Sequence, residues 1–281
     1  MDFLTALRSG SPVFAAELRP PRAELASAEG MDAWIDTYHA VRRLTREGTF
    51  VCITDSAVGA AEEDNLRHLV TNLQRDVPRE RIVPFMTSKH TLDYCLSYAE
   101  RARQSGFPAL VVLGGDKSVG TARNVEHAWQ LRQILRQHHP TLTLGGWANP
   151  HADAERQIDF LLEPNFTAEF FLTQVVSHHD LPVVSRFIET AEKRGVGLPA
   201  VFGVFYYRSA NPKTLNVLRS FLPVPVEELT REFGEGATAE DVCARTLRGL
   251  VDAGARHFYI SNLPVAQAQH VLGSILSKAN L

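Results

Sequence analysis

The sequence predicts a single-domain α/β protein, a (β/α)₈ or TIM barrel, that spans residues 1–281. Short β-branched or apolar runs alternate with longer amphipathic segments along the whole chain. This alternation is typical of parallel strands joined by right-handed helical crossovers. Eight such units fit within about 260 residues, close to the size of a closed eight-stranded barrel. No linker, sequence repeat or low-complexity segment divides the chain.

Eight segments are predicted to form the strands: 13–17, 50–54, 81–86, 109–113, 143–147, 170–173, 200–205 and 257–260. The first strand must end near Arg19, because Pro20 and Pro21 have no N–H group to donate to a sheet. Helices are predicted at 31–47, 65–76, 91–106, 123–137 and 181–195, where apolar residues recur at the helical period. Gly106 and Gly195 are predicted to end two of these helices.

An open doubly wound sheet is the alternative fold, and it would place a glycine-rich phosphate loop after its first strand. Here the first strand is followed by Arg-Pro-Pro-Arg at 19–22. The glycine-rich turn at 112–120 has neither the dinucleotide-binding spacing nor the P-loop spacing. The sequence therefore favours the closed barrel.

Composition argues against several classes of function. The chain is 44% hydrophobic and 22% charged, as in ordinary globular proteins, and its net charge of −3 gives no indication of binding to nucleic acid or an anionic membrane. No apolar run approaches the roughly 20 residues of a membrane span, and residues 1–12 lack the apolar core of a signal peptide. Cys52, Cys95 and Cys243 are scattered without CxxC spacing, which favours a reducing, cytoplasmic location.

Polar or aromatic residues follow every predicted strand, where a barrel of this class carries its chemistry. They are Glu17, Thr54 with Asp55, Thr87, Asp116 behind two glycines, Trp147 with His151, Gln174, Tyr206 with Tyr207, and Asn262. Thr54, Thr87 and Asn262 also suit turn or capping roles, and Asp116 could be the N-cap of the next helix. Glu17 is harder to explain in this way, because Asp, Asn or Ser is the better turn residue.

Seven segments resemble the methylenetetrahydrofolate reductase family, in order, from about residue 13 to residue 275: AELRPPR (16–22), FVCIT (50–54), PFMTS (84–88), VVLGGD (111–116), GGWANPHADA (145–154), FFLTQ (170–174) and HFYISN (257–262). The resemblance implies a barrel that reduces methylenetetrahydrofolate to methyltetrahydrofolate. It gives Glu17 the place of the general acid. It gives Asp116 and Gln174 the places of residues that hold the pterin, and Thr54 that of a threonine beside the nicotinamide.

The residue at position 17 suits the acid role chemically. Opening the five-membered ring of the substrate requires a proton on N10, and a carboxylic acid with a raised pKa in an apolar pocket can supply it. The structural alternative is a carboxylate that pairs with Arg19 or Arg22 across the turn, which would lower the pKa of Glu17 instead.

The predicted binding residues match the chemistry of the substrate. The pterin presents amino and ring N–H donors, which the Asp116 carboxylate can accept. The Gln174 amide can both donate and accept, and so can bind a mixed edge. Tyr206, Tyr207 and Trp147 offer rings that could stack on flat ligands, although buried aromatic residues more often belong to the core.

The sequence departs from the family where most members bind FAD. Where most members have an aromatic residue after the second-strand threonine, this chain has Asp55, and where they have a histidine in the third strand it has Phe85. Gly114 replaces the arginine that comes before the family's aspartate, and Glu163 stands in place of a Lys-Arg-Lys run. Losing cations that would pair with a diphosphate weakens such a site. The resemblance is therefore to the flavin-independent branch, in which NADH or NADPH passes hydride directly to the substrate. The residues expected to contact the nicotinamide cofactor are Thr54, Trp147, His151 and Gln174.

Other functions remain open at this point. The chain could bind FAD through different contacts, or be a folate-binding subunit without catalysis in a methyl-transfer system, although binding alone does not need a proton donor such as Glu17. An aldolase is disfavoured, because no lysine ends an inner strand; Lys117 lies one residue past Asp116. No metal site is predicted: histidine pairs occur at 138–139 and 178–179, and adjacent side chains are expected to diverge.

The expected partners are thus a folate substrate and a nicotinamide dinucleotide. The sequence does not distinguish NADH from NADPH, since no Rossmann acid marks the ribose. It does not specify the oligomeric state.

Overall fold

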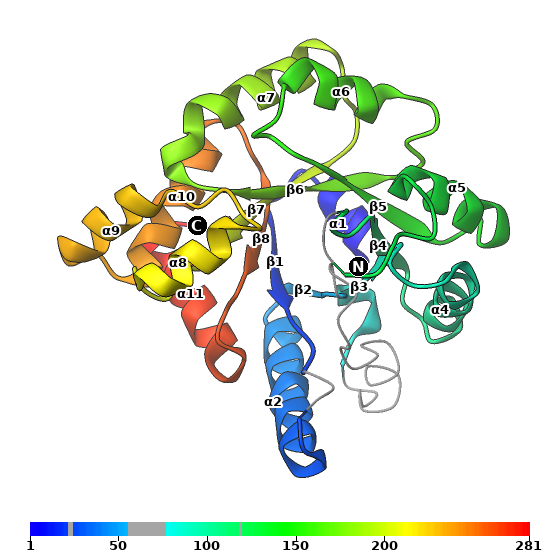
Figure 1. Ribbon diagram of the computed structural model, residues 1–281, viewed down its shortest axis with the longest axis horizontal. Coiled ribbons are helices and arrows are strands. Elements are labelled where there is room, and N and C mark those ends of the chain that lie inside the picture. Colours follow the sequence, from blue (N-terminus) through cyan, green and yellow to red (C-terminus); the bar gives the residue numbers. More distant parts are fainter. Residues whose placement is uncertain (22–24, 56–76, 118–119) are drawn as a thin grey trace.

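The computed structural model describes residues 1–21, 25–55, 77–117 and 120–281, and it shows a closed barrel of eight parallel strands in the order β1 to β8 (Figure 1). The strands are β1 Val13–Leu18, β2 Phe50–Ile53, β3 Ile82–Thr87, β4 Ala109–Leu113, β5 Thr143–Ala148, β6 Phe170–Val176, β7 Ala200–Phe205 and β8 His257–Ser261. Pairing of Ala15 in β1 with Tyr259 in β8 closes the sheet, so neither edge is exposed. The predicted (β/α)₈ class is confirmed.

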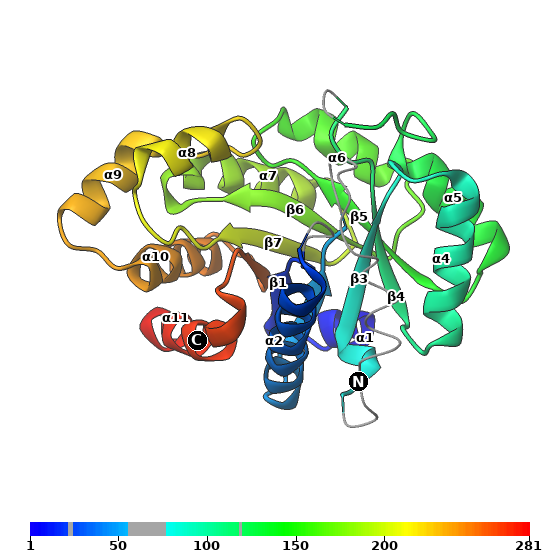
Figure 2. The same cartoon turned by 60° about the horizontal axis from the view of Figure 1, so that its bottom comes forward.

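Helices surround the barrel (Figure 2). They are α1 Phe3–Arg8, α2 Ser27–Arg46, α4 Leu92–Gln104, α5 Ala128–His138, α6 Ala154–Leu162, α7 Leu181–Lys193, α8 Pro212–Arg219, α9 Val226–Gly234, α10 Ala239–Asp252 and α11 Ala268–Ala279, with 3₁₀ turns η1 Arg79–Arg81, η2 His178–Asp180 and η3 Val265–Gln267. The helix predicted at 65–76 lies outside the described residues. None of the helices in the described part of the chain is both long and apolar enough to cross a membrane.

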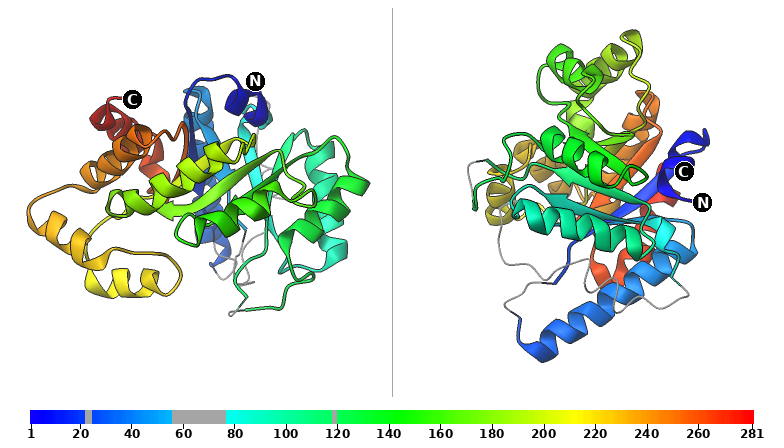
Figure 3. Two further views of the ribbon diagram at one scale, coloured as in Figure 1. Left: turned by 90° about the horizontal axis from the view of Figure 1, so that it is seen from above. Right: turned by 90° about the vertical axis from the view of Figure 1, so that its right-hand side faces the viewer.

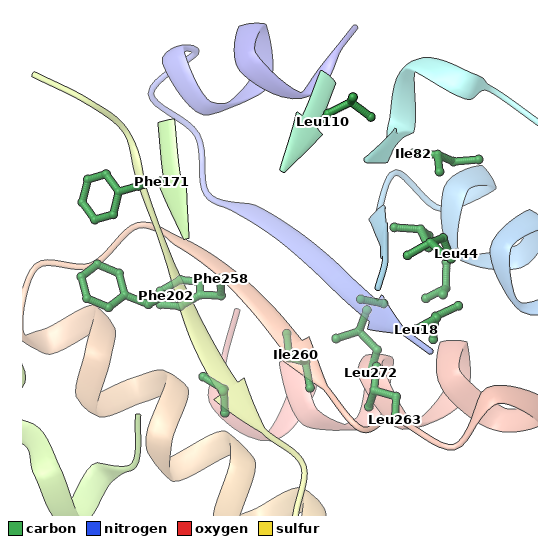
Figure 4. Close-up of a cluster of buried hydrophobic side chains, with 14 of the residues drawn as sticks. Leu18, Leu44, Ile82, Leu110, Phe171, Phe202, Phe258, Ile260, Leu263 and Leu272 are labelled. Atoms are coloured by element: carbon green, nitrogen blue, oxygen red, sulfur yellow. The ribbon is translucent and has the colours of Figure 1, made fainter. Parts of the chain in front are cut away.

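Alternation along the strands divides the core into two layers. In β1, Val13 and Ala15 belong to the cluster inside the barrel, whereas Ala16 and Leu18 pack outward against the helices. Figure 4 draws part of the outer cluster, with Leu44 of α2 among its members. The inner layer is the part of the core that leads to the candidate site.

The N-terminal end of the barrel is closed by α1, a helix that the sequence analysis did not predict. Phe3 is fully buried and meets the rings of Phe50 and Phe170 edge-on, at centroid distances of 5.0 and 5.1 Å. Phe170 in turn needs Gly145 opposite it, because a Cβ at that position would lie 2.5 Å from the ring. Both views of Figure 3 place α1 and α8 on opposite sides of the molecule. One end of the barrel is therefore filled with aromatic side chains, which leaves the other end for a ligand.

Candidate active site at the mouth of the barrel

The C-terminal ends of all eight strands lie at one face, because the strands are parallel and the sheet is closed. Glu17 belongs to the end of β1, Asp116 follows β4, and Gln174 lies near the end of β6. The structure therefore puts these three residues on the face where the sequence analysis expected them. Their roles stay predictions.

Glu17 lies on the inner side of β1, level with Cys52 of β2. Desolvation raises the pKa of its carboxyl group, and a hydrogen bond from Ser261 lowers it; Ser261 Oγ donates to Glu17 Oε1 over 2.5 Å. Burial raises the pKa of Tyr259, and the nearby charge of Glu17 adds to that effect. No arginine pairs with Glu17 among the described residues, so the ion-pair alternative with Arg19 is not observed. Arg22, the other partner considered, lies outside the described residues.

A polar link joins β8 to β6 directly below Gln174. Tyr259 donates its hydroxyl to the carbonyl oxygen of Thr173 over 2.6 Å. The phenol fits there because Gly203 has no side chain: a Cβ at that position would lie 2.4 Å from the Tyr259 hydroxyl. Thr173 Oγ1 also accepts from the Gly203 N–H group, at 3.1 Å. This link fixes the strand segment that presents Gln174.

The Gln174 side chain is partly committed to its own backbone. The pairing of β6 with β7 shifts register between Leu172 and Val175, and the Val175 N–H group donates to Gln174 Oε1 over 2.9 Å. Within the described structure the amide nitrogen of Gln174 has no hydrogen bond. Gln174 can therefore donate to a ligand acceptor through its amide nitrogen, while its oxygen already accepts one hydrogen bond and keeps one lone pair for a ligand donor.

Trp147 and His151 lie beside this segment. Trp147 pairs in register with Leu172 and is 40% exposed, which is unusual for an indole on a barrel strand and leaves a ring free to stack on a flat ligand. His151 Nε2 is 2.9 Å from the carbonyl oxygen of Val175, an acceptor, so Nε2 carries the proton and Nδ1 is left to accept. Thus Trp147, His151 and Gln174 meet at the junction of β5 and β6.

Asp116 is half-buried after a turn in which Gly115 has a φ of +73°, a conformation that favours glycine. It is not the N-cap of α5, because His127 holds that position. Arg123 folds back over this turn and donates to the Gly115 carbonyl oxygen. A Cβ at Gly114 would lie 2.7 Å from Arg123 Cζ, so the guanidinium occupies the space beside residue 114. A cation is thus present where the sequence analysis counted one as lost.

Thr54 and Asp55 contribute to the framework of the mouth. The Thr54 N–H group donates to the Leu18 carbonyl oxygen over 3.0 Å, which extends the pairing of β1 with β2. Asp55 accepts hydrogen bonds from the N–H and hydroxyl groups of Thr87, at 2.7 and 3.1 Å, and contacts His90 Nε2 at 2.7 Å. Asp55 therefore joins the ends of β2 and β3. A direct contact of Thr54 with the nicotinamide stays a prediction.

The two tyrosines after β7 are covered by other parts of the protein in this structure. Tyr206 points outward into the core between barrel and helices, and its hydroxyl donates to Glu240 Oε1 over 2.7 Å. Tyr207 is 5% exposed and packs beside Phe205, with ring centroids 4.8 Å apart. Both rings are covered by the protein itself, so neither offers a face for a ligand in this structure. We leave them out of the site.

One of the two histidine pairs, 178–179, also differs from the sequence-based expectation. The rings of His178 and His179 lie 4.0 Å apart and both approach Glu232 of α9. The expected divergence of adjacent side chains is wrong for this pair, because the two residues begin the 3₁₀ turn η2 and not a helix or strand interior. Since Glu232 is distant in sequence, no local pattern could have indicated this cluster.

Comparison with known proteins gives a match of fold alone. No family model and no curated protein matches the sequence. A solved structure of an uncharacterized protein from Clostridium thermocellum, described as binding two copies of 5-methyl-5,6,7,8-tetrahydrofolic acid, matches with a TM-score of 0.67 and 17% sequence identity, over 96% of each chain. A structure from Aquifex aeolicus VF5 matches with a TM-score of 0.49 and 10% identity, over 99% of this chain and 93% of the other.

Proposed function

We propose that this protein reduces 5,10-methylenetetrahydrofolate to 5-methyltetrahydrofolate, with NADH or NADPH as the hydride donor and without a flavin. The observation that carries the proposal is Glu17, a carboxyl group with a raised pKa inside the mouth of the barrel. Two further points support a folate substrate. The clostridial protein of the same fold is described as binding 5-methyltetrahydrofolate, and the residues at the strand ends resemble those of methylenetetrahydrofolate reductases.

In the proposed reaction, Glu17 donates its proton to N10 of the substrate. The carbon–N10 bond then breaks, and an iminium forms between N5 and the one-carbon unit. The dihydronicotinamide supplies the hydride that reduces this carbon. Ser261 stabilises the carboxylate that Glu17 becomes, since its hydroxyl already donates to Oε1. Burial therefore keeps the pKa of Glu17 raised before the reaction, and the hydrogen bond from Ser261 stabilises the Glu17 carboxylate that forms after proton transfer.

Binding of the pterin is proposed to involve three residues from neighbouring strand ends. Asp116 accepts from the amino edge of the ring, Gln174 donates to a ring acceptor through its free amide nitrogen, and Trp147 stacks on the ring face. His151 supports this arrangement, because it holds the backbone beside Gln174. The same indole could instead stack on the nicotinamide, and substitution of Trp147 with separate KM values for the two substrates distinguishes these roles.

Two replaced residues support a reaction without a flavin: Asp55 is engaged with Thr87 and His90, and Phe85 lines the inner core where the family has a histidine. Glu163, the third replacement, follows the C-terminal end of α6 and so lies toward the N-terminal ends of the strands, away from the mouth. Arg123 instead favours a flavin, since its guanidinium places a cation beside the turn at Gly114. We infer that hydride passes without a flavin, and a direct test of flavin content is part of the proposal.

The test is an assay of NADH and NADPH oxidation by the purified full chain with methylenetetrahydrofolate and no added flavin. We expect formation of 5-methyltetrahydrofolate by a protein without flavin absorbance. Turnover that strictly requires FAD would establish the flavin-dependent alternative. Tight binding of 5-methyltetrahydrofolate with no hydride transfer from either nucleotide, with or without FAD, would instead establish a folate-binding protein without reductase activity, which the clostridial neighbour makes the second candidate.

A further inference from the structure

Three side chains outside the barrel mouth converge with the spacing of metal ligands. His178 and His179 come from η2, directly after β6, and Glu232 comes from α9. Their ligand atoms all lie within 4.8 Å of one another, with His178 Nε2 at 3.0 Å from Glu232 Oε1 and His179 Nε2 at 3.5 Å from Glu232 Oε2. Ligands at about 2.0–2.1 Å from a tetrahedral Zn²⁺ lie about 3.3 Å apart, which is close to these separations.

Polar atoms of this cluster are buried without hydrogen-bond partners. His179 Nε2 and Glu232 Oε2 face each other and have none, and Asp180 Oδ2 in the next residue of the turn also has none. Buried polar atoms are nearly always paired, so three unpaired ones in one place call for an explanation. A metal ion would bind the first two directly. Asp180 lies outside the set of three ligands and suits a hydrogen bond to a metal-bound water.

The contacts behind His178 suit a metal-binding Nε2. Thr246 Oγ1 lies 2.9 Å from His178 Nδ1 and 3.1 Å from the Val242 carbonyl oxygen, and when its hydroxyl donates to Val242 it accepts from Nδ1. With the proton on Nδ1, a neutral His178 directs the lone pair of Nε2 at the carboxylate of Glu232, where two acceptors would repel. An outer hydrogen bond that fixes the tautomer in this way is typical of metal-ligating histidines.

Glu232 is similarly held from behind. Arg245 Nη1 donates to Glu232 Oε1 over 2.6 Å, which orients the carboxylate and leaves Oε2 for a metal. Two imidazoles and one carboxylate are ligands that Zn²⁺ and related transition metals accept. We propose that His178, His179 and Glu232 form a binding site for a divalent metal of the zinc type, with a fourth position for water.

The place of the site indicates what it does. A metal there would join η2 at the end of β6 to α9, two segments 54 residues apart in sequence, measured from His178 to Glu232. His179 and Asp180 also line a groove of about 460 Å³, through which an ion or water could enter. Because η2 begins two residues after β6 ends, the metal would hold the rim of the barrel near Gln174 against the α8–α9 segment.

The test is calorimetric titration of the untagged full chain with Zn²⁺ after treatment with a chelator, supported by visible absorption of Co²⁺ as a measure of tetrahedral geometry. We expect one equivalent per chain with a Kd of about 1 μM or tighter. Glu232→Gln and His179→Ala should each weaken binding at least about tenfold, and Thr246→Val, behind His178, should weaken it about ten- to a hundredfold. His138→Ala is the matched control from the other histidine pair, since His138 is exposed, and should bind like the wild type.

The wild-type titration decides even if a variant does not fold. If the wild type binds no Zn²⁺, or if a folded Glu232→Gln variant binds it as tightly as the wild type, the cluster is a network of hydrogen bonds and ion pairs among His178, His179, Glu232 and Arg245, and the proposal is overturned. Folding of each variant is checked by circular dichroism. The titration contains no folate or nucleotide, so its outcome is independent of the proposed reductase activity.

Discussion

The two ends of the barrel interior contrast in chemistry although the same strands build both. At the N-terminal end, Phe3 packs edge-on against Phe50 and Phe170, and apolar side chains close the interior together with the buried His257 of β8. At the C-terminal end, Glu17 and Ser261 form a short hydrogen bond between the ends of β1 and β8. The contrast shows how a barrel separates stability from chemistry: one end is filled to hold the sheet together, and the other carries polar groups that the fold does not need.

The change from one end to the other occurs within single strands. On the inner face of β1, Val13 and Ala15 belong to the apolar cluster, and Glu17 follows at the next inward position. On β8 the same change from apolar to polar occurs within one side chain, because the Tyr259 ring belongs to the apolar cluster while its hydroxyl donates to the Thr173 carbonyl oxygen. Substitutions at the polar, C-terminal end should therefore change turnover or substrate binding, and substitutions at the apolar, N-terminal end should change the free energy of unfolding.

The largest expected effect is that of Glu17→Gln on turnover. Glutamine keeps the shape and the hydrogen bond from Ser261 but cannot donate a proton to N10. We expect kcat for methylenetetrahydrofolate reduction to fall roughly 10²–10⁴-fold, with similar folate affinity and a normal fold. Steady-state kinetics with either nucleotide measures this. Near-full turnover in the variant would mean that Glu17 is structural and that the proton comes from another group.

Phe3→Ala tests the opposite end. Removing a fully buried aromatic ring should lower the free energy of unfolding by about 3–5 kcal/mol, measured by urea denaturation. The KM for folate should stay unchanged in the folded fraction, because the ring lies at the far end of the barrel. Val217→Ala on α8, where the side chain is 63% exposed, is the control and should change stability by less than about 0.5 kcal/mol. A loss of folate binding without a loss of stability would contradict the separation of the two ends.

Asp116→Ala should have a smaller effect, and on substrate binding. Loss of the carboxylate leaves the donors of the pterin edge unpaired, a cost of about 1.5–3 kcal/mol. We expect the KM for folate to rise roughly ten- to a hundredfold while the KM for the nucleotide changes little. Glu163→Gln, an exposed carboxylate at the end of α6, is the matched control. An unchanged folate KM would mean that Asp116 does not bind the substrate and serves only in the turn over which Arg123 folds.

Much of this contrast could be predicted from the sequence. Strand positions follow from local patterns of apolar residues, and in a barrel the strand ends alone place Glu17, Asp116 and Gln174 on one face. Strand alternation could also have excluded one of the two tyrosines from the predicted site, since Tyr206 and Tyr207 are consecutive and cannot both face inward. The predicted strand at 170–173 continues to Val176, because the polar Gln174 remains in the sheet beside a shift of register.

Other features depend on contacts between distant segments and had no local pattern. The six-residue helix α1 is stabilised by the barrel end into which Phe3 inserts, and a helix of that length has little stability alone. Arg123 replaces a missing cation only because its loop folds back over Gly114. The approach of Glu232 to His178 and His179 likewise exists only in the folded chain.

The smallest expected effect concerns the pH dependence of stability, and it tests whether the ionised form of Glu17 destabilises the folded protein. Burial raises the pKa of Glu17 above its ordinary value of 4.5, so the folded protein binds this proton more tightly than the unfolded chain does. The resulting stabilisation is complete below about pH 4.5 and is lost as the pH rises through the folded-state pKa. Glu17→Gln removes this titration.

The free energy of unfolding of Glu17→Gln, minus that of the wild type, should therefore increase from pH 4 upward and become constant above the folded-state pKa of Glu17. Urea denaturation at a series of pH values measures it, and Glu163→Gln should show no such increase, since that side chain is exposed. A difference that instead grows as the pH falls would mean that the pKa of Glu17 is lowered. In that case a cation such as Arg19 or Arg22 would pair with Glu17 in solution, and this carboxylate would belong to the stabilising part of the barrel and not to its chemistry.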